Sequence, residues 1–92
     1  MSDFVYAPAR DIVASAAEVM KAEIKKGIAE SSGDFCIDMT GVEMIDSRGL
    51  GLLIAAANSL AAVKRRLRIL KATSDIVELM RLMRMDKHMD ID

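Results

Sequence analysis

The sequence is poor in the residues that most often carry chemistry or cross-links. It contains one cysteine, one histidine and one proline, and its aromatic residues are one tyrosine and two phenylalanines. The single cysteine, Cys36, excludes an intrachain disulfide and is typical of a reducing compartment. Cys36 and His88 have no partners at metal-ligand spacing. We therefore expect no bound metal and no cofactor.

The chain also lacks a strong charge of one sign and a long apolar run. Its 13 basic and 14 acidic residues nearly cancel, and its aromatic residues are too few to stack bases, so nucleic acid is not an expected partner. The longest apolar run, Leu50 to Ala57, contains Gly51 and is far too short to span a bilayer. No basic segment followed by an apolar core opens the chain. We expect a cytoplasmic protein that does not insert into membranes.

What is present is an ordinary globular composition. Of the 92 residues, 52% are hydrophobic and 29% are charged, which is typical of a chain that folds on its own. No internal repeat, low-complexity tract or linker divides it. We therefore expect one domain that spans residues 1–92.

Alternating apolar positions predict the strands. Phe35, Ile37 and Met39 indicate a strand over 34–39 that runs into a turn at Thr40 and Gly41, and 67–70 is a second strand. Phe4 to Tyr6 and Asp11 to Val13 are short segments with strand-forming residues on either side of Pro8, and we expect them to form a small hairpin. The segment after Met85 is compatible with a last turn or with a short strand.

Three helices separate these strands. Ser15 and Glu18 have the spacing of a capping box, which predicts a helix from Ser15 to about 31–33. Ser47 is the expected N-cap of a second helix, with the basic residues 64–66 in its last turn, and Thr73 is the expected N-cap of a third. The apolar stripes of the three helices are Ala17, Met20, Ile24 and Ile28; Leu50, Leu53, Ile54, Ala57 and Ala61; and Ile76, Leu79, Met80 and Met83. The alternation predicts crossover units and mostly parallel strands.

Apart from Met1, the methionines divide into two groups. Those on apolar stripes are expected in the core: Met20, Met39, Met80 and Met83. Those in turns or near the end are expected on a protein-binding surface, because the thioether side chain is flexible and adapts to a partner: Met44, Met85 and Met89. Met44 lies three residues before Ser47.

Ser47 is the residue with the clearest functional interpretation. A helix start offers unpaired N–H donors and the positive end of the helix dipole, so it is a favourable place for a phosphate. A hydrolase triad of Ser47, His88 and either Asp46 or Asp90 is an alternative, but Ser47 lacks the Gly-x-Ser-x-Gly setting of a nucleophile. Gly49-Leu-Gly51 lacks the full phosphate-loop pattern and favours tight helix packing and close approach of a partner.

The segment from Asp38 to Leu53, Asp-Met-Thr-Gly-Val-Glu-Met-Ile-Asp-Ser-Arg-Gly-Leu-Gly-Leu-Leu, resembles the signature of the STAS domain family. The name stands for sulphate transporter and anti-sigma factor antagonist domains, in which a strand leads to Asp-Ser-Ser/Thr-Gly-Leu-Gly at the head of a helix. The resemblance covers residues 10–92. It implies a small α/β domain with a mixed, mostly parallel sheet of four or five strands and three or four helices packed on one side.

The resemblance also implies a function. In this family the unphosphorylated domain binds a serine protein kinase with an ATP-binding domain that also serves as an anti-sigma factor. The kinase phosphorylates the serine that corresponds to Ser47, and a metal-dependent serine phosphatase reverses the reaction, so the domain itself catalyses nothing. The implied partner-binding residues are Met44, Asp46, Ser47, Arg48, Gly49, Leu50 and Gly51.

Two departures from the family pattern leave alternatives open. Arg48 stands where a second Ser or Thr is usual, so a second phosphorylation there is absent. The Gly-Glu-Leu-Asp pattern before the first helix is also missing, and Asp11 is about one position off. An adaptor in chemotaxis, secretion or stress signalling, and a soluble subunit of a lipid transporter, therefore remain as alternative functions.

Overall fold

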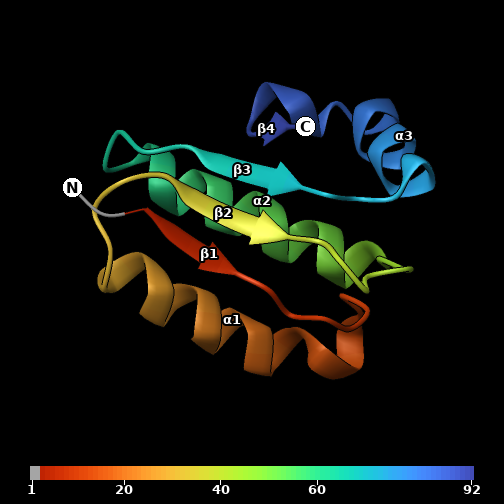
Figure 1. The fold of residues 1–92 in the computed structure, drawn as a ribbon, viewed down its shortest axis with the longest axis horizontal. Helices are drawn as coiled ribbons and strands as arrows, with labels where there is room; N and C mark the ends of the chain where they lie inside the picture. Colours follow the sequence, from red (N-terminus) through yellow and green to blue (C-terminus); the bar gives the residue numbers. More distant parts are fainter. Residues whose placement is uncertain (1–2) are drawn as a thin grey trace.

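The computed structural model describes residues 3–92 and shows one parallel sheet (Figure 1). Its strands lie side by side in the order β1-β2-β3-β4, and each neighbouring pair is parallel. Their bounds are β1 (Phe4–Tyr6), β2 (Phe35–Asp38), β3 (Leu67–Leu70) and β4 (Asp90–Ile91). The expected α/β class with a mostly parallel sheet is confirmed, and the strands in the described part of the chain are all parallel.

The helices follow the strands in alternation. They are α1 (Ala14–Ala29), α2 (Ser47–Ala61), α3 (Ser74–Leu82) and the short 3-10 helix η1 (Met85–Lys87). Helices α1 and α2 pack against each other and cover the same face of the sheet, whereas α3 lies beyond the C-terminal end of β3, next to η1 (Figure 1). No helix within residues 3–92 combines the length and apolar content that a bilayer crossing requires.

The core lies between the sheet and the α1–α2 layer. Phe35 pairs with Leu67 and Ile37 with Ile69, and all four side chains are completely buried. Phe4 stacks on Phe35 with ring centroids 5.3 Å apart. Gly27 makes room for this pair, because a Cβ at this position would lie 2.8 Å from the Phe4 ring and 2.9 Å from the Phe35 ring. The interior of α1 therefore accepts a poor helix former for the sake of packing.

The predicted hairpin is wrong. β1 pairs in parallel with β2, in the register Phe4 with Phe35, and the segment after Pro8 forms only one isolated bridge, between Ile12 and Ile45. The parallel pairing with β2 places Phe4 beside Phe35, and their rings stack. Long-range packing thus decides the strand partner here.

The predicted capping box of the first helix is also wrong. Helix α1 begins at Ala14, the cap position is Val13 and no side chain of its own segment caps it. The Ala14 N–H instead donates to Asp46 Oδ2 at 2.8 Å. At its other end α1 stops at Ala29, slightly before the predicted end.

The basic residues 64–66 do not lie in the last turn of α2, which ends at Ala61. Arg65 instead serves the C-terminal end of α1. Its guanidinium donates to the carbonyl oxygens of Ile28 and Gly33 and to Ser31 Oγ, at 3.0, 2.8 and 2.6 Å. The expected pairing of a cation with a helix C-terminus therefore occurs, but on a different helix.

The predictions for the start of the third helix and for the methionines are partly confirmed. Thr73 is the N-cap of α3, as predicted, and its Oγ1 accepts from the Ile76 N–H at 3.2 Å. Met20, Met39 and Met80 are buried and Met44 is exposed, as expected. Three methionine predictions are wrong: Met83 is 58% exposed, whereas Met85 and Met89 are buried because η1 and β4 fold back onto the sheet.

Candidate functional site

The start of α2 is capped by Asp46 and not by Ser47. The backbone of Asp46 is extended, and its Oδ1 accepts from the Gly49 N–H at 2.9 Å. Ser47 is the first residue of the helix. The predicted helix start is therefore confirmed, but the predicted cap is one residue too late. Aspartate is as good an N-cap as serine, and its charge adds a favourable interaction with the helix dipole.

Asp46 also reaches the start of α1. Its second carboxylate oxygen is the acceptor for Ala14, so one side chain satisfies backbone donors at the starts of two helices. Asp11 makes the reciprocal connection, because its Oδ1 accepts from the N–H groups of Glu43 and Met44 at 2.9 and 3.1 Å. We call Asp11 and Asp46, with the backbone groups that they bind, the aspartate clasp. It fixes the loop that leads into α2 against the segment that leads into α1.

Gly49 lies inside this connection. It is buried, and a Cβ built on it would lie 2.0 Å from the carbonyl oxygen of Ile12. That carbonyl accepts from the Asp46 N–H at 3.3 Å, and the Ile12 N–H donates to the Met44 oxygen at 3.0 Å. Gly49 therefore permits close packing of α2 on the chain before α1, and it presents no side chain to a partner.

The Ser47 hydroxyl is presented to solvent. The residue is exposed, and its Oγ makes no hydrogen bond to any residue among 3–92. The neighbouring Arg48 is also exposed, and its guanidinium forms an ion pair with Glu18 of α1, with 3.6 Å between Nη2 and Oε1. Met44 is 60% exposed, Leu50 is half-buried and Gly51 is exposed. The structure thus brings the predicted site residues together around one helix start, with Gly49 beneath the surface.

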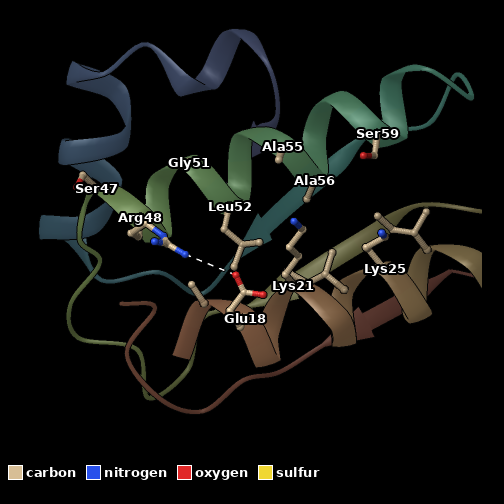
Figure 2. Close-up of a pocket in the computed structure, with 13 residues that line it drawn as sticks. Glu18, Lys21, Lys25, Ser47, Arg48, Gly51, Leu52, Ala55, Ala56 and Ser59 are labelled. Atoms are coloured by element: carbon tan, nitrogen blue, oxygen red, sulfur yellow. Dashed lines mark ion pairs between the residues drawn. The ribbon is translucent and has the colours of Figure 1, made fainter. Parts of the chain in front are cut away.

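Ser47 and Arg48 also line a groove between α1 and α2, with a volume of about 460 Å³ (Figure 2). We call it the α1–α2 groove. Sequence reasoning missed it, because it depends on how two helices cross. Its other lining residues are Ala17, Glu18, Lys21, Ile24, Lys25 and Ile28 of α1, and Gly51, Leu52, Ala55, Ala56 and Ser59 of α2.

The residues of the alternative hydrolase triad are not connected. Asp46 uses its carboxylate oxygens on Gly49 and Ala14, and Asp90 accepts from the Arg66 guanidinium at 2.6 Å. Within the described residues, neither carboxylate binds the His88 ring, and no hydrogen bond joins His88 to Ser47. The base and the orienting group that a serine nucleophile requires are not assembled around Ser47.

The clasp makes folding sensitive to acid. Hydrogen bonds from the Gly49 N–H and then from the Ala14 N–H hold the pKa of Asp46 below its ordinary value of 3.8. A carboxyl group whose pKa is lower in the folded state stabilises the fold above the unfolded pKa, and this contribution is lost as the pH falls through the folded pKa.

Replacing Asp46 with Asn should therefore lower the midpoint of thermal unfolding at neutral pH by ~5 °C or more, because an amide has only one acceptor oxygen for two N–H donors. The deficit should begin to shrink as the pH falls below the ordinary pKa of 3.8, and it should disappear as the pH falls through the lower pKa of folded Asp46, where the wild-type carboxyl becomes protonated too. Calorimetry of both proteins between neutral and acidic pH measures this. Glu78→Gln, which removes an exposed carboxylate from α3, is the control for loss of one charge. A deficit that is the same at every pH would contradict the role of the Asp46 charge.

The fold and the site define a small parallel α/β domain that presents a serine hydroxyl at a helix start beside a groove. A family model described as "Mlab, STAS domain" matches residues 10–91. The chain therefore belongs to this STAS domain family. Among curated proteins, no sequence matches the chain significantly.

Two solved structures share the fold. The crystal structure of a Thermotoga maritima protein, named as a candidate anti-sigma factor antagonist, gives a TM-score of 0.87 at 16% identity, over 99% of this chain and 80% of that chain. SpoIIAA, an anti-sigma factor antagonist in its unphosphorylated form, gives a TM-score of 0.64 at 19% identity, over 86% of this chain and 70% of that chain. At these identities the likeness establishes the fold alone.

Proposed function

We propose that this chain is a phosphorylation-switched binding domain of the anti-sigma factor antagonist type, and that Ser47 is the residue modified. The observation that carries the proposal is the exposed Ser47 hydroxyl, free of hydrogen bonds within the described chain, at the first position of α2. A kinase can reach such a hydroxyl without unfolding the domain. The similarity of the fold to SpoIIAA, an anti-sigma factor antagonist described in an unphosphorylated form, supports the same proposal.

The proposed partner is a serine protein kinase with an ATP-binding domain, which also acts as the anti-sigma factor. The unphosphorylated domain, taken as residues 1–92, binds it in the cytoplasm and frees the sigma factor. Phosphorylation of Ser47 ends the binding, and a metal-dependent serine phosphatase restores it. The domain itself catalyses nothing in this scheme and needs no cofactor. Its proposed binding surface is formed by Met44, Asp46, Ser47, Arg48, Leu50 and Gly51, with Gly49 setting the spacing beneath them.

Electrostatics at the helix start support a local switch. A phosphate adds about −1.5 to −2 charges, and the dipole of α2 and the neighbouring Arg48 favour such a charge within the free domain. In a complex the same group would be covered by a partner that packs on Met44 and Leu50. Desolvating an unpaired charge costs several kcal/mol, and about 1.4 kcal/mol already means a tenfold loss of affinity. No change of fold is needed for the switch.

Mass spectrometry of the chain purified from its native cells is the first test. We expect a fraction of the molecules to carry one added phosphate, located on Ser47, and treatment with a metal-dependent serine phosphatase should remove it. The chain with Ser47→Ala, expressed in the same cells, is the control and should carry none. A phosphate located on another residue, or an unmodified chain in every growth condition, would contradict the proposal.

The family model that matches is described as "Mlab, STAS domain" and not as an anti-sigma factor antagonist, and Arg48 departs from the usual Ser or Thr. Both facts leave two competing functions, a signalling adaptor with another output and a subunit of a lipid transporter. Co-purification distinguishes them: a serine kinase supports a switch, whereas an ATPase subunit with Ser47 unmodified supports the transporter function.

A further inference from the structure

The α1–α2 groove has an apolar floor and a cationic rim. Ile24 and Ile28 of α1 and Leu52 of α2 provide apolar side chains, and the α2 side is otherwise formed largely by small residues: Gly51, Ala55 and Ala56. A Cβ on Gly51 would meet nothing within 4 Å, so this side of the groove is open. A partner backbone can therefore come close to α2 along the groove.

The charges of the rim differ from those of the whole chain. Lys21, Lys25 and Arg48 line the groove with a single carboxylate, Glu18, so its net charge is +2, whereas the chain carries −1. Figure 2 shows the Arg48–Glu18 ion pair reaching from one helix to the other near the Ser47 end, with Lys21 and Lys25 farther along α1. Lys21 and Lys25 make no ion pair within the described residues. The groove is therefore electrostatically suited to an acidic ligand.

The shape of the groove favours a helix over a small molecule. On α2 its lining runs from Ser47 to Ser59, which is roughly 18 Å at 1.5 Å per residue and corresponds to about three turns of a helix. Lys21, Lys25, Gly51 and Ala55 are all exposed along it, so the groove is open over its length. Sites for small ligands usually enclose most of the ligand surface. A third helix laid between α1 and α2 would cover the half-buried side chains of Ile28 and Leu52 and the exposed Ala55.

We propose that the α1–α2 groove binds an acidic amphipathic helix of a protein partner. Apolar side chains on one face of that helix contact Ile28, Leu52 and Ala55, and its flanking carboxylates pair with Lys21 and Lys25. The inference rests on the proposed function for the identity of the partner, and it adds a reason why Ser47 is the switch. A phosphate on Ser47 brings about −1.5 to −2 charges to one end of the groove and so cancels the net charge that attracts the acidic helix.

A synthetic peptide tests this directly. The probe is a fluorescein-labelled peptide of roughly 14 residues, with leucine at positions i, i+3, i+4 and i+7 and glutamate at most others. A peptide with lysine in place of each glutamate is the charge control, and dodecanoate is the small anionic amphiphile. We expect saturable binding of the acidic peptide to the wild-type chain, with an increase in helical circular dichroism, and no comparable binding of the basic peptide or of dodecanoate.

Variants locate the site. Lys21→Glu combined with Lys25→Glu should weaken binding about tenfold or more, because two attractions become repulsions. Ala55→Leu, which fills the groove, should weaken it to a similar extent. Lys26→Glu changes an exposed cation of α1 that does not line the groove, and it should change the affinity less than about twofold. Unchanged unfolding midpoints would show that each variant is folded.

Several results would overturn the inference. They are equal binding of both peptides, binding that the groove variants leave unchanged, binding of dodecanoate alone, and no saturable binding up to about 1 mM peptide. These results are distinguishable from failure of the proposed switch. If Ser47 is phosphorylated in cells but the groove variants bind the peptide as wild type does, the switch stands and the groove inference fails.

Discussion

Replacing Gly49 with alanine should lower the midpoint of thermal unfolding by about 15 °C or more. The added Cβ would lie 2.0 Å from the carbonyl oxygen and 2.9 Å from the carbonyl carbon of Ile12. Both are backbone atoms, and Ile12 is held by hydrogen bonds to Met44 and Asp46, so it cannot move away without breaking them. Forced overpacking against fixed atoms costs about 3 kcal/mol or more, and about 1 kcal/mol shifts the midpoint of a domain this small by about 4–8 °C.

Gly51→Ala is the matched control, since both glycines lie in α2, two residues apart. A Cβ at Gly51 would meet nothing within 4 Å, and alanine is the better helix former by about 1 kcal/mol. We expect this variant to unfold at the same temperature as the wild type or higher. If Gly49→Ala and Gly51→Ala behaved alike in calorimetry, the contact between α2 and Ile12 would not be as close as the structure places it.

Replacing Ser47 with aspartate should weaken binding of the proposed kinase partner by about tenfold to a hundredfold. The carboxylate introduces one negative charge where the phosphate would introduce about two, and a partner that covers it must remove its water. The free domain should be as stable as the wild type or slightly more so, because a carboxylate in the first turn interacts favourably with the helix dipole. Titration calorimetry with the purified partner gives the affinity, and thermal unfolding gives the stability.

Two further variants isolate the effect of the charge at this position. Ser47→Ala removes the hydroxyl without adding charge and should bind as the wild type does. Ser74→Asp places the same carboxylate at the first position of α3, which is also an exposed serine, and lies outside the proposed surface. It should retain binding. Equal affinities of the Ala and Asp variants at Ser47 would remove the electrostatic basis of the switch.

Local sequence patterns were sufficient to predict the order of the main strands and helices and the start of α2. The alternation of Phe35 and Ile37 is a strong signal because both side chains are completely buried in the core. The predicted stripe of α2 is only partly confirmed, because Leu53 and Ala57 are buried but Ala61 is exposed. The sequence predicts Thr73 as an N-cap because a threonine hydroxyl can accept from a backbone N–H three residues later, and the structure shows this bond to the Ile76 N–H. A short stretch of sequence contains both partners of such a local contact, so the contact can be predicted from the sequence.

The errors arise where distant segments decide the local structure. Ser15 and Glu18 have the spacing of a cap, but the donor of Ala14 is satisfied by Asp46, which lies in another loop. The aspartate preference at N-cap positions was a signal that could have identified Asp46 one residue before Ser47. Nothing in the sequence signalled that Asp11 would hold the backbone of Glu43 and Met44. The α1–α2 groove depends on how closely two helices approach each other, so local sequence patterns do not predict it either.

The double role of Asp46 has a consequence for how the domain opens. Because one carboxylate accepts from the first turns of both α1 and α2, fraying at the start of either helix removes one of the two hydrogen bonds that orient the Asp46 side chain. We therefore expect hydrogen exchange to show the starts of the two helices opening together, even though the whole of β2 separates them along the chain.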